Sequence, residues 1–151
     1  MARSRSWGLD PTVQADEADE SPPPSRGTVL VAEGQDDIRR LFRATLERAG
    51  FAVLTAENGA EALCVFSEHL HEIDLVLLDF SIPVLKGEVV FRDMRSARDE
   101  LPVILCGGYA DWPAVTSFAE SEVIGVLAKP CSTNGLVDRV QGTLRAVGEQ
   151  R

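Results

Sequence analysis

Three charged residues each follow a short run of apolar residues directly, and their types are suited to handling phosphoryl groups. They are Glu33, Asp79 and Lys129. Two carboxylates held close together raise each other's pKa and are stabilised by a hard cation such as Mg²⁺, whereas a lysine supplies a compact positive charge for an anion. Taken singly, Glu33 and Lys129 are interpreted as solvated surface charges and Asp79 as a helix cap. We therefore predict a phosphoryl-handling site only if the fold brings all three together.

The strongest strand pattern of the sequence ends at Asp79. The four apolar residues Leu75–Leu78 are typical of a strand that is buried on both faces of a parallel sheet. Ligands bind at the carboxyl ends of the strands in open α/β sheets, so Asp79 stands where chemistry is expected. Four further apolar runs complete the predicted strands, which span residues 29–32, 51–54, 75–78, 102–105 and 124–128.

The segments between these runs have helical periodicity. In the first segment, Ile38, Leu41, Phe42 and Leu46 recur at spacings of three and four, which predicts an amphipathic helix over about residues 36–49 with these side chains buried. We predict the other helices around residues 63–70, 89–97 and 114–119 and after Ser132.

This alternation of strand and helix predicts an α/β fold, with a doubly wound five-stranded parallel sheet and five helices. For so short a unit we expect the flavodoxin-like strand order 2-1-3-4-5. That order places the ends of the first and third strands side by side. Glu33 and Asp79 are then neighbours.

Composition favours one folded domain and excludes several partners. The chain has 151 residues, of which 44% are hydrophobic, and a formal net charge of -9, which opposes nucleic acid or an anionic membrane surface as a partner. No apolar run has the length of a membrane span, so we expect a cytoplasmic protein. Cys64, Cys106 and Cys131 lack metal-ligand spacing and are odd in number, so neither a zinc site nor a disulfide framework is expected.

Residues 1–26 differ from the rest of the chain. They contain four closely spaced acids from Asp16 to Glu20, then Ser21–Ser25 with three prolines, and hardly any large apolar residue. Such a segment cannot bury enough surface to offset its conformational entropy. We predict a disordered tail or linker over residues 1–26 and a folded domain over residues 27–151.

From Thr28 to about Val147 the sequence resembles the receiver domain of two-component response regulators, and most closely the receivers at the C-terminal end of hybrid histidine kinases. The likeness is carried by an acid after the first strand, a strand that ends in aspartate, a proline-led fourth strand and a Lys-Pro pair. These motifs are Val29-Leu30-Val31-Ala32-Glu33 followed by Ile38-Arg39, Asp74 to Asp79 with Pro83 and Gly87, Leu101 to Cys106, and Lys129-Pro130.

The resemblance implies a role for each site residue. Asp79 would accept a phosphoryl group from a histidine kinase or a phosphotransfer protein, and Lys129 would pair with the acyl phosphate. Mg²⁺ would be held by Asp79, by the backbone carbonyl of Ser81, and by Glu33 through water. A cis bond would join Lys129 to Pro130. The domain would signal by protein contact rather than act as an enzyme, and the resemblance leaves a homodimer open.

The sequence departs from the family pattern at three positions. Gly34 stands where the family has a second acid that binds magnesium directly, so we expect Mg²⁺ binding to be weak. Gly107 stands where a Ser or Thr hydroxyl turns toward the phosphoryl group, and Val126 replaces the usual Tyr or Phe that follows that hydroxyl. Asp36 or Asp37 could compensate for the lost acid, although a role at the start of the first helix is the simpler interpretation.

Three hypotheses of function follow. The leading one is a stand-alone receiver in a phosphorelay with Asp79 as acceptor. The alternative is a pseudo-receiver that is not phosphorylated and serves as a protein-binding module, which Gly34 and Gly107 favour. A hydrolase with Asp79 as nucleophile would need a second acid two residues later, where Ser81 stands.

Deleting residues 1–26 should leave the melting temperature within a few degrees of the full chain, because the segment has no pattern that forms a core. Thermal unfolding of the two proteins followed by circular dichroism measures this. A large fall would show that the segment packs on the domain.

Overall fold

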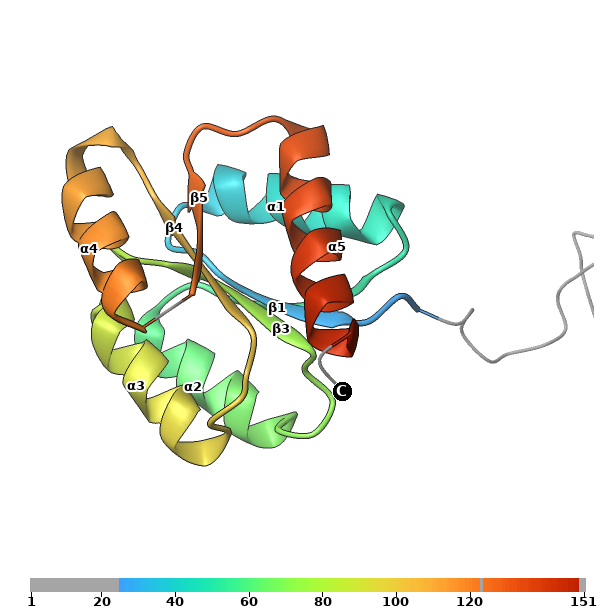
Figure 1. Ribbon diagram of the computed structural model, residues 1–151, viewed down its shortest axis with the longest axis horizontal. Helices are drawn as coiled ribbons and strands as arrows, with labels where there is room; N and C mark the ends of the chain where they lie inside the picture. Colours follow the sequence, from blue (N-terminus) through green and yellow to red (C-terminus); the bar gives the residue numbers. More distant parts are fainter. Residues whose placement is uncertain (1–24, 123, 150–151) are drawn as a thin grey trace, which may run out of the picture.

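Five parallel strands form one sheet in the order β2-β1-β3-β4-β5. The computed structural model describes residues 25–122 and 124–149. The order is the one expected from the sequence, and the fold is the flavodoxin-like α/β fold, with five helices joining and following the strands (Figure 1). The strands are β1 Thr28–Ala32, β2 Ala52–Ala56, β3 Leu75–Asp79, β4 Val103–Gly107 and β5 Gly125–Ala128.

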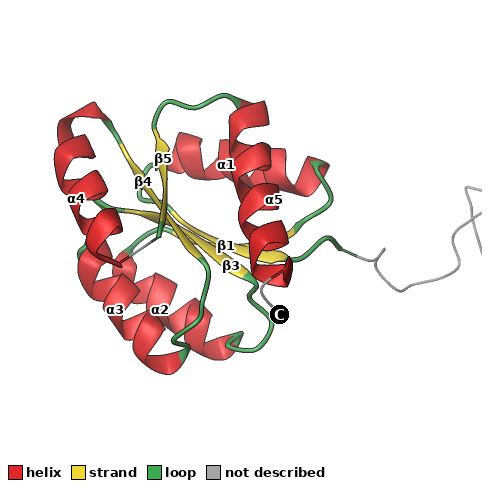
Figure 2. Cartoon of the chain, in the orientation of Figure 1, coloured by secondary structure: helices red, strands yellow, loops and turns green. Residues whose placement is uncertain are grey.

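Helices cover both faces of the sheet (Figure 2). On one face α1 and α5 bury Phe42, Leu46, Leu136 and Val140 against the strands, and on the other face α2, α3 and α4 bury a second apolar cluster. Burial on both sides explains why the strands are near-continuous apolar runs. The helices are α1 Asp36–Arg48, α2 Gly59–Glu68, α3 Gly87–Ala97, α4 Trp112–Glu122 and α5 Thr133–Glu149, with a short 3₁₀ helix, η1 Tyr109–Asp111, before α4.

Strand register brings the predicted site residues to one edge. Ala32 pairs with Leu78, so the residues that follow, Glu33 and Asp79, meet at the carboxyl ends of β1 and β3. Gly107 pairs with Ala128, which carries Lys129 to the same edge. Leu75–Leu78 are at most 1% exposed and hold β3 at the centre of the sheet, which fixes the position of Asp79 at the carboxyl end of that strand.

Several predicted boundaries shift by a few residues. β2 begins at Ala52 rather than at residue 51, and its burial is partial because it is an edge strand. β4 runs from Val103 to Gly107 rather than over 102–105, so Gly107 belongs to the strand. α4 extends over Trp112–Glu122 rather than only 114–119.

The prediction that Leu41 is buried was wrong. The side chain is 51% exposed, because α1 contacts the sheet through Phe42, Thr45 and Leu46, and Leu41 projects past that stripe.

Of the predicted tail, only Ser25 and Arg26 lie within the described residues. The backbone N–H of Arg26 donates to the Gly50 carbonyl at 2.9 Å and its guanidinium donates to the Ala49 carbonyl at 3.0 Å. The chain therefore enters the fold beside the end of α1. In the part of the chain that the structure describes, no helix is both long and apolar enough to cross a membrane.

The loop between β3 and α3 contains a tight turn centred on Val84. The Leu85 N–H donates to the Pro83 carbonyl at 2.9 Å, which closes a γ-turn, and Val84 has φ of 76°. This left-handed conformation is strained for a β-branched residue, and the side chain gains little from packing because it is 73% exposed.

Val84→Gly should therefore raise the free energy of unfolding by about 0.5–1 kcal/mol, because glycine adopts positive φ without strain. Val89 is a matched control, since it is also exposed but lies in α3. Val89→Gly should lower the free energy of unfolding by a few tenths of a kcal/mol. Urea denaturation measures both, and a loss of stability in Val84→Gly would contradict the strain argument.

Candidate functional site

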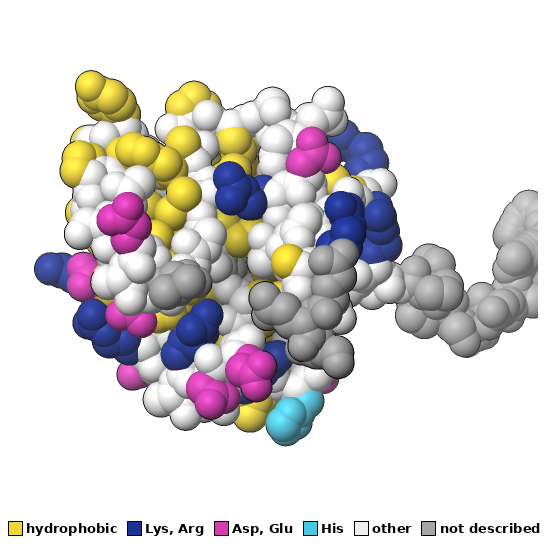
Figure 3. Space-filling view, viewed as in Figure 1, with side chains coloured by type: hydrophobic (Ala, Val, Ile, Leu, Met, Phe, Trp, Pro, Cys, Tyr) yellow, Lys and Arg dark blue, Asp and Glu magenta, His cyan; other side chains and the backbone are white. Residues whose placement is uncertain are grey.

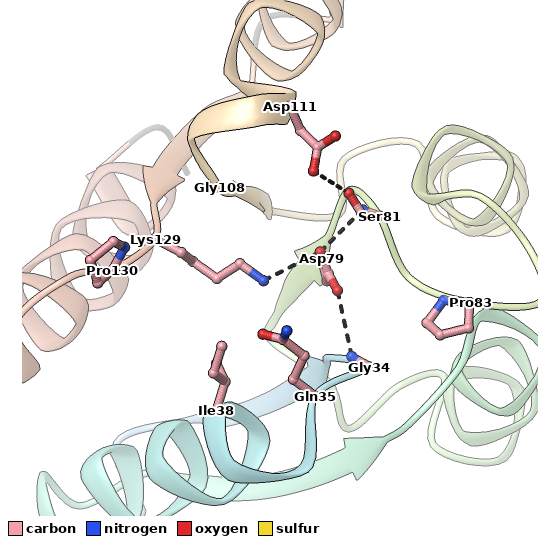
Figure 4. Close-up of a pocket in the computed structure, with 10 residues that line it drawn as sticks. All are labelled: Gly34, Gln35, Ile38, Asp79, Ser81, Pro83, Gly108, Asp111, Lys129 and Pro130. Carbon is pink, nitrogen blue, oxygen red and sulfur yellow. Dashed lines mark hydrogen bonds and ion pairs between the residues drawn. The ribbon is translucent and has the colours of Figure 1, made fainter.

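A cavity of about 510 Å³ opens at the carboxyl edge of the sheet, where four loops meet (Figure 4). It contains Asp79 and Lys129, as the sequence predicts, and one carboxylate that sequence reasoning did not assign to it. The cavity is lined by Gly34, Gln35 and Ile38 after β1, Asp79, Ser81 and Pro83 after β3, Gly108 and Asp111 after β4, and Lys129 and Pro130 after β5.

Lys129 joins the two predicted carboxylates. Its Nζ donates to Glu33 Oε1 at 2.9 Å and to Asp79 Oδ1 at 3.5 Å. Glu33 is 1% exposed and Asp79 is 5% exposed, so both acids are buried. The three charged side chains that the sequence singled out therefore form one ion-paired cluster, and the Lys129–Pro130 peptide bond is cis, as the resemblance implied.

Burial and pairing act in opposite directions on the cluster. Burial raises the pKa of Glu33, the Gln35 N–H and Lys129 lower it, and the Asp79 charge raises it again, with a net rise. Burial by itself lowers the pKa of Lys129, but the hydrogen bond to Glu33 and the charges of Asp79 and Glu33 outweigh it, so this pKa is raised. Lys129 is therefore a fixed cation at neutral pH.

Backbone N–H groups hold the same carboxylates from the other side. The Ser81 N–H donates to Asp79 Oδ1 at 3.0 Å, and the Gly34 N–H lies 3.5 Å from Asp79 Oδ2. The Gln35 N–H donates to Glu33 Oε2 at 3.0 Å. Asp79 Oδ1 thus has two donors, whereas Oδ2 has one long contact and is the freer oxygen.

Position 34 faces the cavity, but the space for a side chain there is taken. A Cβ atom on Gly34 would lie 3.8 Å from Asp79 Oδ2 and only 2.6 Å from Cδ of Pro83. Since the proline ring is rigid, a carboxylate at position 34 requires the β3–α3 loop to move. Pro83 therefore occupies the space that an acidic side chain at position 34 would need.

Oxygen donors for a magnesium ion remain, but they are few. Asp79 and Ser81 line the cavity and carry oxygen atoms of the kind that Mg²⁺ binds. Glu33 does not line the cavity, and both of its carboxylate oxygens accept hydrogen bonds, so it could act on a metal only through water. Among the described residues, no group of three His, Cys, Asp or Glu side chains lies close enough to hold a metal directly. Neither Asp36 nor Asp37 lines the cavity: Asp36 pairs with Arg39, and Asp37 accepts the Ile38 N–H.

Position 107 is filled in a similar way. A Cβ atom on Gly107 would lie 2.5 Å from Cγ2 of Val115, a fully buried residue of α4. Val126 is partly buried and packs against the same apolar cluster. At position 107, where the family carries a hydroxyl, β4 thus packs closely against α4, and at position 126, where it carries an aromatic ring, the β5 valine packs against the core.

Asp111 is the residue that sequence reasoning missed. Its carboxylate reaches the cavity and accepts a hydrogen bond from the Ser81 hydroxyl (Figure 4). The strand-end argument that found Asp79 could have found it too, because Asp111 lies in the short η1 turn that follows β4.

Gly107→Ala should lower the free energy of unfolding by about 1–3 kcal/mol, because the added methyl group overlaps Val115. Combining it with Val115→Ala should give a total loss at least about 1 kcal/mol smaller than the sum of the two single losses. Gly108→Ala is the matched control, since no atom lies within 4 Å of its Cβ position. Urea denaturation of the four variants tests this, and additive losses would refute the overlap.

Comparison with known proteins agrees with this geometry. The model of the family described as the response regulator receiver domain matches residues 29–141. A probable transcriptional regulator ycf27 of Cyanidium caldarium is 32% identical over 119 residues, which cover 79% of this chain and 47% of that protein. The sensor kinase CckA of Brucella abortus (strain 2308) is 30% identical over 117 residues, 78% of this chain and 12% of the kinase. The chain therefore spans less than half of either relative.

A solved structure supports the same assignment at the level of the fold. The response regulator receiver domain protein of Clostridium thermocellum superposes with a TM-score of 0.77 at 24% identity, over 83% of this chain and 99% of that one. The matched family, the strand order and the clustered acids and lysine lead to one conclusion: the chain belongs to the response regulator receiver domain family of two-component systems.

Proposed function

We propose that this domain accepts a phosphoryl group on Asp79 in a phosphorelay and signals by protein contact. The observation that carries the proposal is the position of Lys129, which lies 3.5 Å from the Asp79 carboxylate and is held there by Glu33. Receiver domains interact with histidine kinases or phosphotransfer proteins and generally bind Mg²⁺. Here the departures at Gly34 and Gly107 leave this central pair intact.

The chemistry depends on position and charge. Asp79 Oδ2 has one long contact and is available to attack phosphorus in line, so that an O–P bond forms while the P–N bond to the donor histidine breaks. Lys129 neutralises negative charge on the transferring group, and the Ser81 N–H holds Oδ1 in place. Mg²⁺, when bound through Asp79, Ser81 and Glu33, would neutralise further charge, with an affinity weakened by the loss at position 34.

The rim of the cavity offers a surface for the phosphoryl donor. A histidine that reaches Asp79 must come from a partner that covers the rim, and Ile38 and Pro130 line it. Leu41, three residues after Ile38 on α1, exposes half of its apolar side chain. A partner helix laid across this part of α1 would bury Leu41.

The second candidate is a pseudo-receiver that binds partners without being phosphorylated. Its support is the packing of Pro83 and Val115 into the positions of the missing acid and hydroxyl. Packing of this kind would preserve the fold after the chemistry has been lost.

Incubating the full chain with acetyl phosphate and Mg²⁺ should add one phosphoryl group, measured by intact mass. Asp79→Asn should abolish the addition, because the amide cannot form an acyl phosphate. Asp138→Asn is the matched control: it removes an exposed acid of α5 and should leave labelling unchanged. A wild-type chain that stays unmodified at high Mg²⁺, while an ordinary receiver is labelled in parallel, would favour the pseudo-receiver.

A further inference from the structure

The Ser81–Asp111 hydrogen bond closes the cavity on the side opposite Gly34 (Figure 4). It joins two loops that otherwise belong to different strands: Ser81 follows β3, and Asp111 ends η1 directly before α4. Asp111 is partly exposed, and the Ser81 hydroxyl is the hydrogen-bond partner of its carboxylate among the described residues. A negative charge is thus tethered at the mouth of the cavity that contains Asp79.

In the family, a Ser or Thr hydroxyl turns toward the phosphoryl group and an aromatic ring follows it. This chain has neither side chain at the corresponding positions. Gly107 has no hydroxyl to turn toward a phosphoryl group, and Val115 fills the space that such a side chain would need. Val126 is packed against the apolar core instead of carrying a mobile aromatic ring. If the phosphoryl group is sensed at this edge, the signal has to pass through another group that lines the cavity.

We propose that Asp111 senses phosphorylation by repulsion: the acyl phosphate on Asp79 drives the Asp111 carboxylate away from Ser81 and releases η1. This inference rests on the proposed function of Asp79. A phosphoryl group at pH 7 carries more negative charge than the carboxylate it replaces. Lys129 is the cation that lines the cavity within the described residues, and it already serves Glu33 and Asp79. No second cationic side chain among the described residues lines the cavity to offset the added charge beside Asp111.

The release would reach the surface through η1 and the first turn of α4. Tyr109 begins η1 and is 95% exposed, so movement of this turn displaces a large aromatic side chain that partners can contact. Hydrophobic side chains gather on the molecular surface near the top of α4 (Figure 3). Gly108 directly precedes η1, and a Cβ atom there would have no other atom within 4 Å, so packing does not hold this point of the turn. Trp112 follows Asp111 and packs partly against the core, so its fluorescence reports on this movement.

The test uses the full chain carrying Trp7→Phe, so that Trp112 is the sole tryptophan. Fluorescence is recorded before and after phosphorylation by acetyl phosphate, and intact mass on the same samples gives the phosphorylated fraction by which each change is divided. Asp111→Asn preserves the size of the side chain and removes its charge. It should reduce the Trp112 response per phosphoryl group at least about fivefold, because repulsion scales with charge.

Two further variants sharpen the test. Ser81→Ala removes the tether, so the unphosphorylated protein should already show most of the fluorescence of the phosphorylated wild type. Glu120→Gln removes an exposed acid of α4 that does not line the cavity, and its response should equal that of wild type. Equal responses from Asp111→Asn and wild type at equal phosphorylation would overturn the sensor while leaving Asp79 as the acceptor. A wild-type chain that gains no mass would overturn both proposals.

Discussion

Lys129 lies between two buried carboxylates, and the arrangement of the whole carboxyl edge depends on that contact. Its ammonium group is within 2.9 Å of Glu33 and 3.5 Å of Asp79, and the acids come from strands that pair side by side. Removing one partner of a buried ion pair leaves an uncompensated charge, which typically costs about 3–5 kcal/mol. The cluster therefore fixes the ends of β1, β3 and β5 together, and the same charges equip the edge for an anion.

Two of the three departures from the family pattern, Gly34 and Gly107, are structural as well as chemical. Pro83 occupies the space beside Gly34, and Val115 occupies the space beside Gly107, in each case closer than a side chain would tolerate. Close-packed interiors resist added volume, so these glycines are coupled to their neighbours and cannot be exchanged singly without strain. The absence of an acid at position 34 and of a hydroxyl at position 107 is thus matched by close packing at this edge, where Ser81 and Asp111 also make contact.

Much of the fold and part of the site could be predicted from the sequence because both depend on local patterns. The apolar run Leu75–Leu78 identifies a strand buried on both faces, and strict alternation with helical segments predicts a doubly wound parallel sheet. The order 2-1-3-4-5 was expected only because it is the usual one for so short a unit, and the structure has that order. Since parallel strands end at a common edge, Glu33, Asp79 and Lys129 were predicted to converge, and the structure brings them together. Local patterns did not reveal that Leu41 is exposed, because the helical period describes a stripe wider than the surface α1 buries.

What the sequence by itself determined is therefore the set of strand ends and the charges they carry. Only the tertiary structure decided how the gaps between those ends are filled: Pro83 against Gly34, Val115 against Gly107, and Asp111 against Ser81. Each of these pairs joins residues from different loops or elements, and their fit depends on distances of a few ångströms across the sheet edge. The spacing of residues along the chain does not predict such distances, because it indicates which residues share a helix or strand and not how closely two elements approach each other.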